Sequence, residues 1–193
     1  MSGSARNTAL QTWGPDLLAV AERSIDHGLA LGLPPDLDIE GWPEPLRAER
    51  ASFVTLKTAD GHLRGCIGSI EPHRPLVADI NANAFAAAFE DPRFPPLRKA
   101  ERADLACELS VLTRPEPMEF ADETDLVQRL VPGVDGVLIE AGTRRGTLLP
   151  AVWEQLPDPL EFWRTLKEKA GIAEGMLPDD LAVYRYRAEH IGG

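Results

Sequence analysis

The chain of 193 residues is long enough for one domain, or for one larger and one smaller lobe that share a core. Its 44% hydrophobic and 26% charged residues are typical of a globular protein, and no apolar run approaches the ~18 residues that span a bilayer. A formal net charge of −11 repels anionic polymers and surfaces, so we expect no membrane association and no nonspecific nucleic-acid binding.

Cysteine and histidine usage gives no sign of a disulfide framework or a metal site. Cys66 and Cys107 are too few for a framework, and the four histidines show no ligand spacing. The first ten residues, MSGSARNTAL, lack the basic and apolar regions of a secretory signal. We therefore expect a cytoplasmic protein with free thiols, and we expect no cofactor because neither GxGxxG nor GxxxxGK[ST] occurs.

Apolar periodicity and turn signals in the first half of the chain predict a helix, a proline-rich connection, two strands and an alanine-rich helix. The expected residues are, in that order, 15–31, 33–50, 52–58, 62–70 and 75–90. Asp60-Gly61 between the strands is a strong hairpin signal. The alanines exclude bulk, which predicts a helix lying close against a sheet, and Asp91-Pro92 ends that helix.

The second half predicts a strand, a short helix, a second hairpin, two further helices and a last strand. The expected residues are 103–113, 124–131, 136–142 with 147–150 around a corner at 144–146, 148–156, 159–171 and 180–191. Helices and strands mix without a strand–helix–strand rhythm. This predicts an α+β fold, with a largely antiparallel sheet flanked by helices.

The stretch LRGCIGSI (63–70) gives up packing at two glycines and places a thiol near a guanidinium. Because side chains alternate along a strand, Arg64 and Cys66 are expected to share one face. Leu63 and Ile67 are then expected to anchor the strand in the core from the other face. A guanidinium beside the thiol would lower the pKa of Cys66, and the glycines would let a substrate or another backbone approach. A cysteine used only for packing is the alternative.

The same alternation predicts that Cys107 faces the core with Leu109 and Val111. It places Glu108 and Ser110 on the opposite face, where they would line a cleft or simply be solvated. Asn83 interrupts an alanine stripe and is either a tether to a loop or a ligand contact. Arg93 and the Arg144-Arg145 pair could gather at an anionic group, although exposed arginines at turns are commoner. His62 and His73 could pair with Cys66, but each is more simply a surface histidine.

Four blocks of the sequence, taken in order and spacing, closely resemble the AMMECR family, which is named for an Alport-syndrome chromosomal region. The blocks are LRGCIGSI, NANAFAAAFEDPRFPPL, ELSVLTRPEP and PGVDGVLIEAGTRRGTLLPAVWEQLPDPLEFWRTLKEKAG. The prokaryotic members are called AmmeMemoRadiSam system protein A. The resemblance covers nearly the whole chain, and Leu148 is a departure because many members carry phenylalanine there.

The resemblance implies a single AMMECR-type domain over residues 1–193, with an α+β fold, a larger and a smaller lobe and a cleft between them. It implies no established activity. The suspected role centres on the RGCIG segment, with a nucleotide, a nucleic acid or a small metabolite as substrate. A Memo-like protein and a radical S-adenosylmethionine protein are the implied partners in a shared pathway.

Two functions are therefore predicted. In the first, an enzyme or ligand-binding protein, Cys66 is the nucleophile or thiolate ligand, Arg64 keeps it ionised or grips an anion, and Glu108 carries a proton. The ligand-binding candidates come from the motif blocks and the arginine pair: Gly65, Gly68, Asn83, Arg93, Ser110, Arg145 and Thr147. In the second, the protein is a non-catalytic binding module in which the RGCIG segment is structural.

Overall fold

The computed structural model describes residues 9–192, which divide into two compact units. Unit 1 takes the described residues 9–112 and 189–192, and unit 2 takes Thr113–Ala188. Each unit combines helices with one four-stranded sheet of mainly antiparallel strands, which confirms the α+β prediction. The sequence pattern predicts one sheet, whereas the strands form two.

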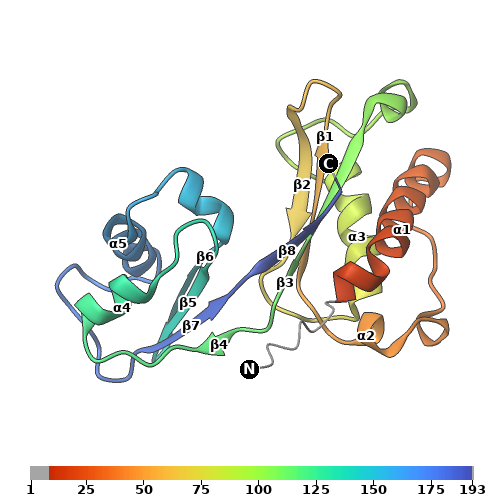
Figure 1. Cartoon of the computed structure of the whole chain (residues 1–193). Coiled ribbons are helices and arrows are strands. Elements are labelled where there is room, and N and C mark those ends of the chain that lie inside the picture. Colours follow the sequence, from red (N-terminus) through yellow and green to blue (C-terminus); the bar gives the residue numbers. More distant parts are fainter. Residues whose placement is uncertain (1–8, 193) are drawn as a thin grey trace. The chain divides into compact units, whose positions relative to one another are not determined.

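Unit 1 packs two long helices against one face of a sheet with strand order β2-β1-β3-β8 (Figure 1). Its helices and strands are α1 (Ala9–Leu31), η1 (Ile39–Gly41), α2 (Glu44–Arg47), β1 (Ser52–Lys57), β2 (Leu63–Gly68), α3 (Leu76–Phe89), η2 (Lys99–Asp104), β3 (Ala106–Leu112) and β8 (Ala188–Ile191). Buried aliphatic side chains of the sheet, including Val54, Leu56 and Leu109, meet α1 and α3 in one core.

The sheet of unit 1 has an inner face toward α1 and α3 and an opposite, outer face. Along β1, buried and half-buried residues alternate, as a strand with one covered face requires. Because cross-strand partners share a face, the registers of β1 with β2 and β3 extend this assignment across the sheet. The outer face carries Phe53, Thr55, Lys57, Cys66, Gly68, Glu108 and Ser110.

Gly65 brings β2 and α3 into close contact. A Cβ at Gly65 would lie 2.0 Å from the carbonyl oxygen of Ala87, a distance that no side chain can adopt. The alanine-rich helix therefore lies close against the sheet as predicted. The sequence allows either a substrate or another backbone to approach the glycines, and at Gly65 it is the backbone of α3 that does so.

A bulge in β2 changes the predicted facing of its first residues. Leu56 pairs with Gly65 but Lys57 pairs with Leu63, so Arg64 is the extra residue in the ladder. The strict alternation expected for this stretch is lost at that point. Leu63 is 41% exposed rather than in the core, and Arg64 is buried to 7% exposure.

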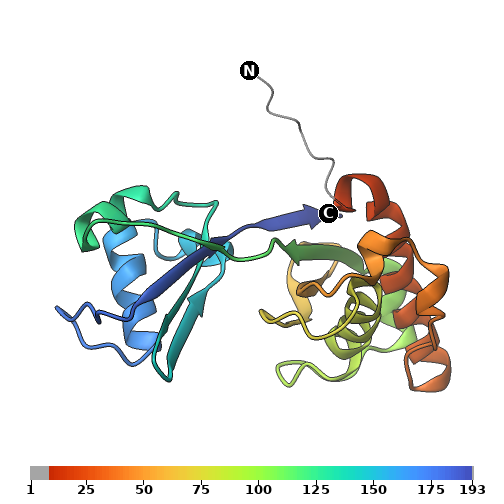
Figure 2. The same ribbon diagram turned by 90° about the horizontal axis from the view of Figure 1, so that it is seen from below.

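Unit 2 packs α4 and α5 with a sheet of order β4-β7-β5-β6 (Figure 2). Its helices and strands are β4 (Glu116–Pro117), α4 (Glu123–Arg129), β5 (Gly136–Ala141), β6 (Arg144–Leu148), η3 (Pro150–Glu154), α5 (Pro159–Lys169) and β7 (Ala182–Tyr186). The rings of Trp153 and Phe162 stack with centroids 3.8 Å apart in the core of unit 2. Asp122 and Asp158 cap α4 and α5 through their side chains.

Several predicted element bounds are wrong for local reasons. The second hairpin turns at Gly142, which has φ +59°, so residues 144–146 belong to β6 rather than to a corner. The helix expected over 148–156 is only the short η3, because Leu148 completes β6. Pro15 lies inside α1 rather than at its start.

The last predicted strand is divided, since β7 joins the sheet of unit 2 and β8 the sheet of unit 1. Within residues 9–192, no helix combines the length and the apolar character that crossing a bilayer requires.

Replacing Gly65 by alanine should destabilise unit 1 by about 1–3 kcal/mol, because the added Cβ collides with a main-chain carbonyl that can move only with α3. Urea unfolding followed by circular dichroism measures the change. Gly61→Asn is the matched control: Gly61 has φ +79° and open space around it, and asparagine tolerates that conformation. Equal stability of the Gly65→Ala protein and the wild type would contradict the close approach.

Candidate functional site

Both main-chain polar groups of Cys66 are held by side chains from the loop after α3. The Asp91 carboxylate accepts the Cys66 N–H at 2.9 Å, and Arg93 Nη2 donates to the Cys66 carbonyl at 3.0 Å. Arg93 also grips Asp91 with two parallel bonds of 2.9 and 2.7 Å. Because β2 is an edge strand, this pair takes the place of a neighbouring strand at Cys66. We call it the Asp91–Arg93 clamp.

The clamp is ionised. Asp91 is only 3% exposed, yet its pKa is held far below its ordinary value, chiefly by the hydrogen bond from Arg93 and further by the Cys66 N–H, against the effect of burial. The pKa of Arg93 is raised, first by its hydrogen bond to Asp91 and also by the Cys66 thiol beside it. The guanidinium near the thiol therefore belongs to Arg93.

The Cys66 thiol lies half-buried on the outer face, with its Sγ 3.3 Å from Thr55 Oγ1. Since the clamp binds the main chain of Cys66, this is a non-hydrogen-bonded cross-strand pair, the kind whose side chains are closest. Thr55 is also the partner of Glu108 on β3. Cys66 and Glu108 are thus two strand spacings apart, about 10 Å. Glu108 instead pairs with Lys57 at 2.7 Å.

Cys107 differs from Cys66 in burial. It faces the core at 7% exposure, as the sequence predicts, and burial raises the pKa of its thiol to about 12. Cys107 can therefore serve as an internal control, a buried thiol with which the reactivity of Cys66 is compared.

Gly68 lets an aromatic ring lie across β2 next to the thiol. A Cβ at Gly68 would come within 2.4 Å of the Phe53 ring and 2.3 Å of the Ser52 carbonyl oxygen. Phe53 and Gly68 are cross-strand partners on the outer face, and on that face the neighbouring pair is Thr55 and Cys66. The second glycine of the motif therefore shapes the surface beside Cys66.

Arg64 does not share the surroundings of the thiol, which corrects its predicted role in ionising Cys66. Its Nε donates to Glu101 at 2.8 Å and its Nη2 to the carbonyl of Pro95 at 3.0 Å, because the bulge redirects the residue. The hydrogen bond from Arg64 lowers the pKa of Glu101 to about 2. The ring of Phe94 lies 5.8 Å from the Arg64 guanidinium and 5.7 Å from that of Arg93.

Asn83 is occupied as a tether. Its amide donates to the main-chain carbonyl of Ser52 at 3.1 Å, to the Ser52 hydroxyl at 3.2 Å and to Asp79 at 2.9 Å. Asp79 is fully buried and also accepts from Arg74 at 2.8 Å. This network fixes α3 to the start of β1, so the structure favours the first of the two readings that the sequence allows for Asn83.

The remaining predicted residues are divided between the two units. Ser110 lies on the outer face as predicted, and its Oγ is 2.8 Å from Nδ1 of His190 on β8. In unit 2, Arg145 pairs with Glu140 at 3.1 Å and Thr147 Oγ1 lies 2.8 Å from the Tyr186 hydroxyl. A ligand-binding role for these residues stays a prediction.

The structure thus brings Arg93 to Cys66, and places Glu108 on the same face at a distance. Thr55 was missed because a cross-strand contact depends on register, which sequence spacing does not give. The sequence places Asp91 at the end of a helix and, within the DPRF block, in the family motif, but it gives the carboxylate no partner. Its spacing from Arg93 in DPRF was a usable signal, since an Asp two residues before an Arg can form a local pair. His73 contacts Ser69 and not the thiol.

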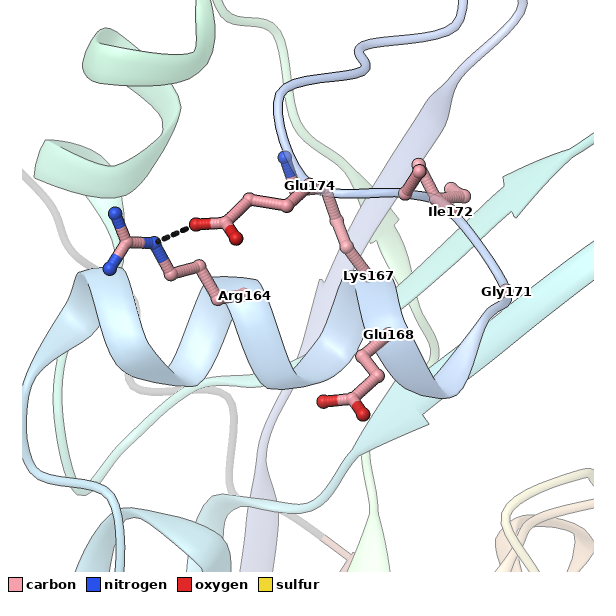
Figure 3. Close-up of a pocket in the computed structure, with 7 residues that line it drawn as sticks. Arg164, Lys167, Glu168, Gly171, Ile172 and Glu174 are labelled. Carbon is pink, nitrogen blue, oxygen red and sulfur yellow. Dashed lines mark ion pairs between the residues drawn. The ribbon is translucent and has the colours of Figure 1, made fainter.

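A pocket in the described part of the chain lies in unit 2, beside the end of α5, and has a volume of about 540 Å³ (Figure 3). Its charged groups are mostly paired: Arg164 with Glu174 at 3.4 Å, and the buried Lys167 with Glu123. None of the predicted site residues lines it. Residues 9–192 contain no group of three or more His, Cys, Asp or Glu side chains placed to hold a metal ion.

Comparison with known proteins gives a consistent picture. The family model AMMECR1 matches residues 18–191. A protein of Methanothermobacter thermautotrophicus is 40% identical over 91% of this chain and 92% of its own length, and one of Thermotoga maritima is 40% identical over 89% and 92%. The crystal structure of an uncharacterized protein from Pyrococcus horikoshii is similar with a TM-score of 0.74 and 34% identity, covering 94% of this chain and 91% of that one.

Asp91→Asn should cost about 2 kcal/mol of unfolding free energy at neutral pH, because it removes charge-assisted hydrogen bonds to Arg93 and Cys66. The lowered pKa of Asp91 fixes the pH dependence. The stabilisation is complete above the ordinary carboxyl pKa of 3.8 and is lost as the pH falls below it. Urea titrations at several pH values should therefore show the two proteins converging in acid. A difference that is constant across pH would show that the clamp is not ionic.

Proposed function

Because this chain belongs to the AMMECR1 family and the clamp holds the main chain of its motif cysteine, we propose that it binds a small molecule or nucleotide on the outer face of unit 1. The Cys66 thiol then attacks this ligand or binds to it. Cys66 is the proposed nucleophile or thiol ligand. The observation that supports this most is the clamp itself: it fixes the main chain of Cys66 from both sides while the thiol stays half-exposed.

The neighbours of the thiol suit a ligand with an aromatic part and polar ends. The Phe53 ring beside Cys66 offers a stacking surface, and Thr55 offers a hydroxyl that can donate to a thiolate or accept from a thiol. Glu108, about 10 Å away, can meet only the far end of such a ligand. We therefore propose that Glu108 binds the ligand, and we do not propose that it carries a proton to or from the Cys66 sulfur.

The second candidate is a protein-binding module that breaks no bond. It is favoured by the structural roles of the other motif residues. Arg64 binds Glu101, while Gly65 leaves room for the Ala87 carbonyl and Gly68 leaves room for the Phe53 ring. It is also favoured by the surroundings of the thiol, because among residues 9–192 no histidine or carboxylate side chain hydrogen-bonds to the Cys66 sulfur. A Memo-like protein and a radical S-adenosylmethionine protein are the proposed partners. The two free thiols are consistent with the proposed cytoplasmic location.

Native-state alkylation should separate the two cysteines. Iodoacetamide should label Cys66 in the folded protein and Cys107 only after unfolding, because Cys66 is half-exposed and Cys107 is buried. Mass spectrometry of Cys66→Ser and Cys107→Ser proteins assigns the labelled site. If both thiols are protected until unfolding, Cys66 is structural and the nucleophilic role is wrong.

A ligand on the outer face should slow the alkylation of Cys66. We expect at least one nucleoside monophosphate to lower the labelling rate of the Cys107→Ser protein in a saturable way, since the ligand would cover the thiol and the Phe53 ring. Phe53→Leu should keep the alkylation rate without ligand and weaken this protection. Rates that no nucleotide changes would count against a nucleotide ligand and favour the binding module.

A further inference from the structure

A small pocket in unit 2 is lined by residues of β4 and of the segment that follows it, of β7 and of α4. Its volume is about 260 Å³. The residues that line it are Pro117, Met118, Glu119, Arg129 and Arg185. None of them belongs to the site proposed around Cys66, and two are arginines that come from different elements.

Arg185 is a half-buried cation that has no partner in the part of the chain that the structure describes. Among residues 9–192, its guanidinium makes no hydrogen bond and no ion pair. It stands on β7 opposite Val137 of β5, and Val137 is fully buried. Glu116 faces it across β4 and β7, yet the two side chains form no ion pair. A charge at the margin of a core loses hydration, so an uncompensated one there needs an explanation beyond the fold.

Arg129 is compensated but keeps donors in reserve. Its Nε donates to Asp125 at 2.8 Å, and Asp125 raises the pKa of Arg129 first through this bond, with Glu119 adding a smaller effect. In the part of the chain that the structure describes, neither of its Nη atoms has a protein partner. The positive charge that remains uncompensated in the pocket is therefore that of Arg185.

In the pocket beside the end of α5, by contrast, the cations are paired with carboxylates. There Arg164 is paired with Glu174, as Figure 3 shows, and Lys167 with Glu123. The two pockets thus differ in whether a cation is left for a ligand. We choose the smaller pocket as the candidate ligand site because it contains an unpaired cation, and its volume plays no part in the choice.

We propose that the pocket between β4, β7 and α4 binds the oxyanion of a small molecule, a phosphate or a carboxylate group. Arg185 supplies the charge and a planar fork of donors that matches two oxygens, and the Nη atoms of Arg129 add further donors. Pro117 and Met118 offer an apolar wall to the carbon part of the ligand. The Glu119 carboxylate disfavours a second negative group nearby. The site is independent of the function proposed for Cys66.

Titration of the intact chain with inorganic phosphate and, separately, with acetate tests the site, at constant ionic strength set by chloride. We expect saturable NMR shifts of the amides of residues 117–119, 129 and 185 with at least one anion, and the stronger response identifies the oxyanion. Arg185→Gln should weaken binding at least about tenfold, because a charge-assisted hydrogen bond is lost. Arg144→Gln, an exposed arginine of the same unit, should leave binding unchanged. No saturable shift with either anion, or equal binding by Arg185→Gln, would overturn the proposal.

Thermal unfolding in chloride gives a readout that needs no ligand. If Arg185 is kept for an anion, Arg185→Met should unfold at the same temperature as the wild type or higher, since the apolar stem is kept and an unpaired charge is removed. Glu116→Gln should also keep the midpoint and bind the anion at least as well. A lower midpoint for Arg185→Met would show a structural partner for the guanidinium and would refute the assignment.

Discussion

The ionic pair of Asp91 and Arg93 on the main chain of Cys66 is the interaction on which the candidate site depends. An edge strand has unpaired N–H and C=O groups, and at this position they would otherwise be open to water or to another chain. The clamp binds both groups, and its own charges neutralise each other. It therefore fixes where β2 runs without covering the outer face, so the thiol remains half-exposed.

The two glycines of the motif serve opposite faces of the same strand. Gly65 lets the carbonyl of Ala87 approach on the inner face, which sets how deeply α3 packs. Gly68 lets the Phe53 ring lie over the outer face next to Cys66. Any side chain at either place would move the strand or the ring, so packing and site geometry restrict the same short segment. This explains why a strand accepts residues that weaken it.

The sequence predicts most helices and strands of this fold because their periodicity is local. Helix α3, the first hairpin with its turn at Gly61 and the core facing of Cys107 all follow from spacing and turn chemistry. The position of Arg64 could not be predicted, because one extra residue in β2 moves it out of the alternation. The contact of Thr55 with Cys66 depends on strand register, and the division of strands between two sheets depends on pairing between distant segments.

Charge compensation separates the structural parts of this protein from those that remain available for chemistry. Glu101 neutralises the buried Arg64, and Glu123 neutralises the buried Lys167. Such pairs satisfy the fold and leave little for a ligand, since a partner already occupies each donor. Arg185 in unit 2 has no such partner among the described residues. Within the same residues the Cys66 sulfur has the Thr55 hydroxyl and the nearby Arg93 guanidinium, but no carboxylate or histidine bonded to it. Where a fold positions a reactive or charged group without satisfying it, a ligand is the economical explanation, and both positions meet that condition independently.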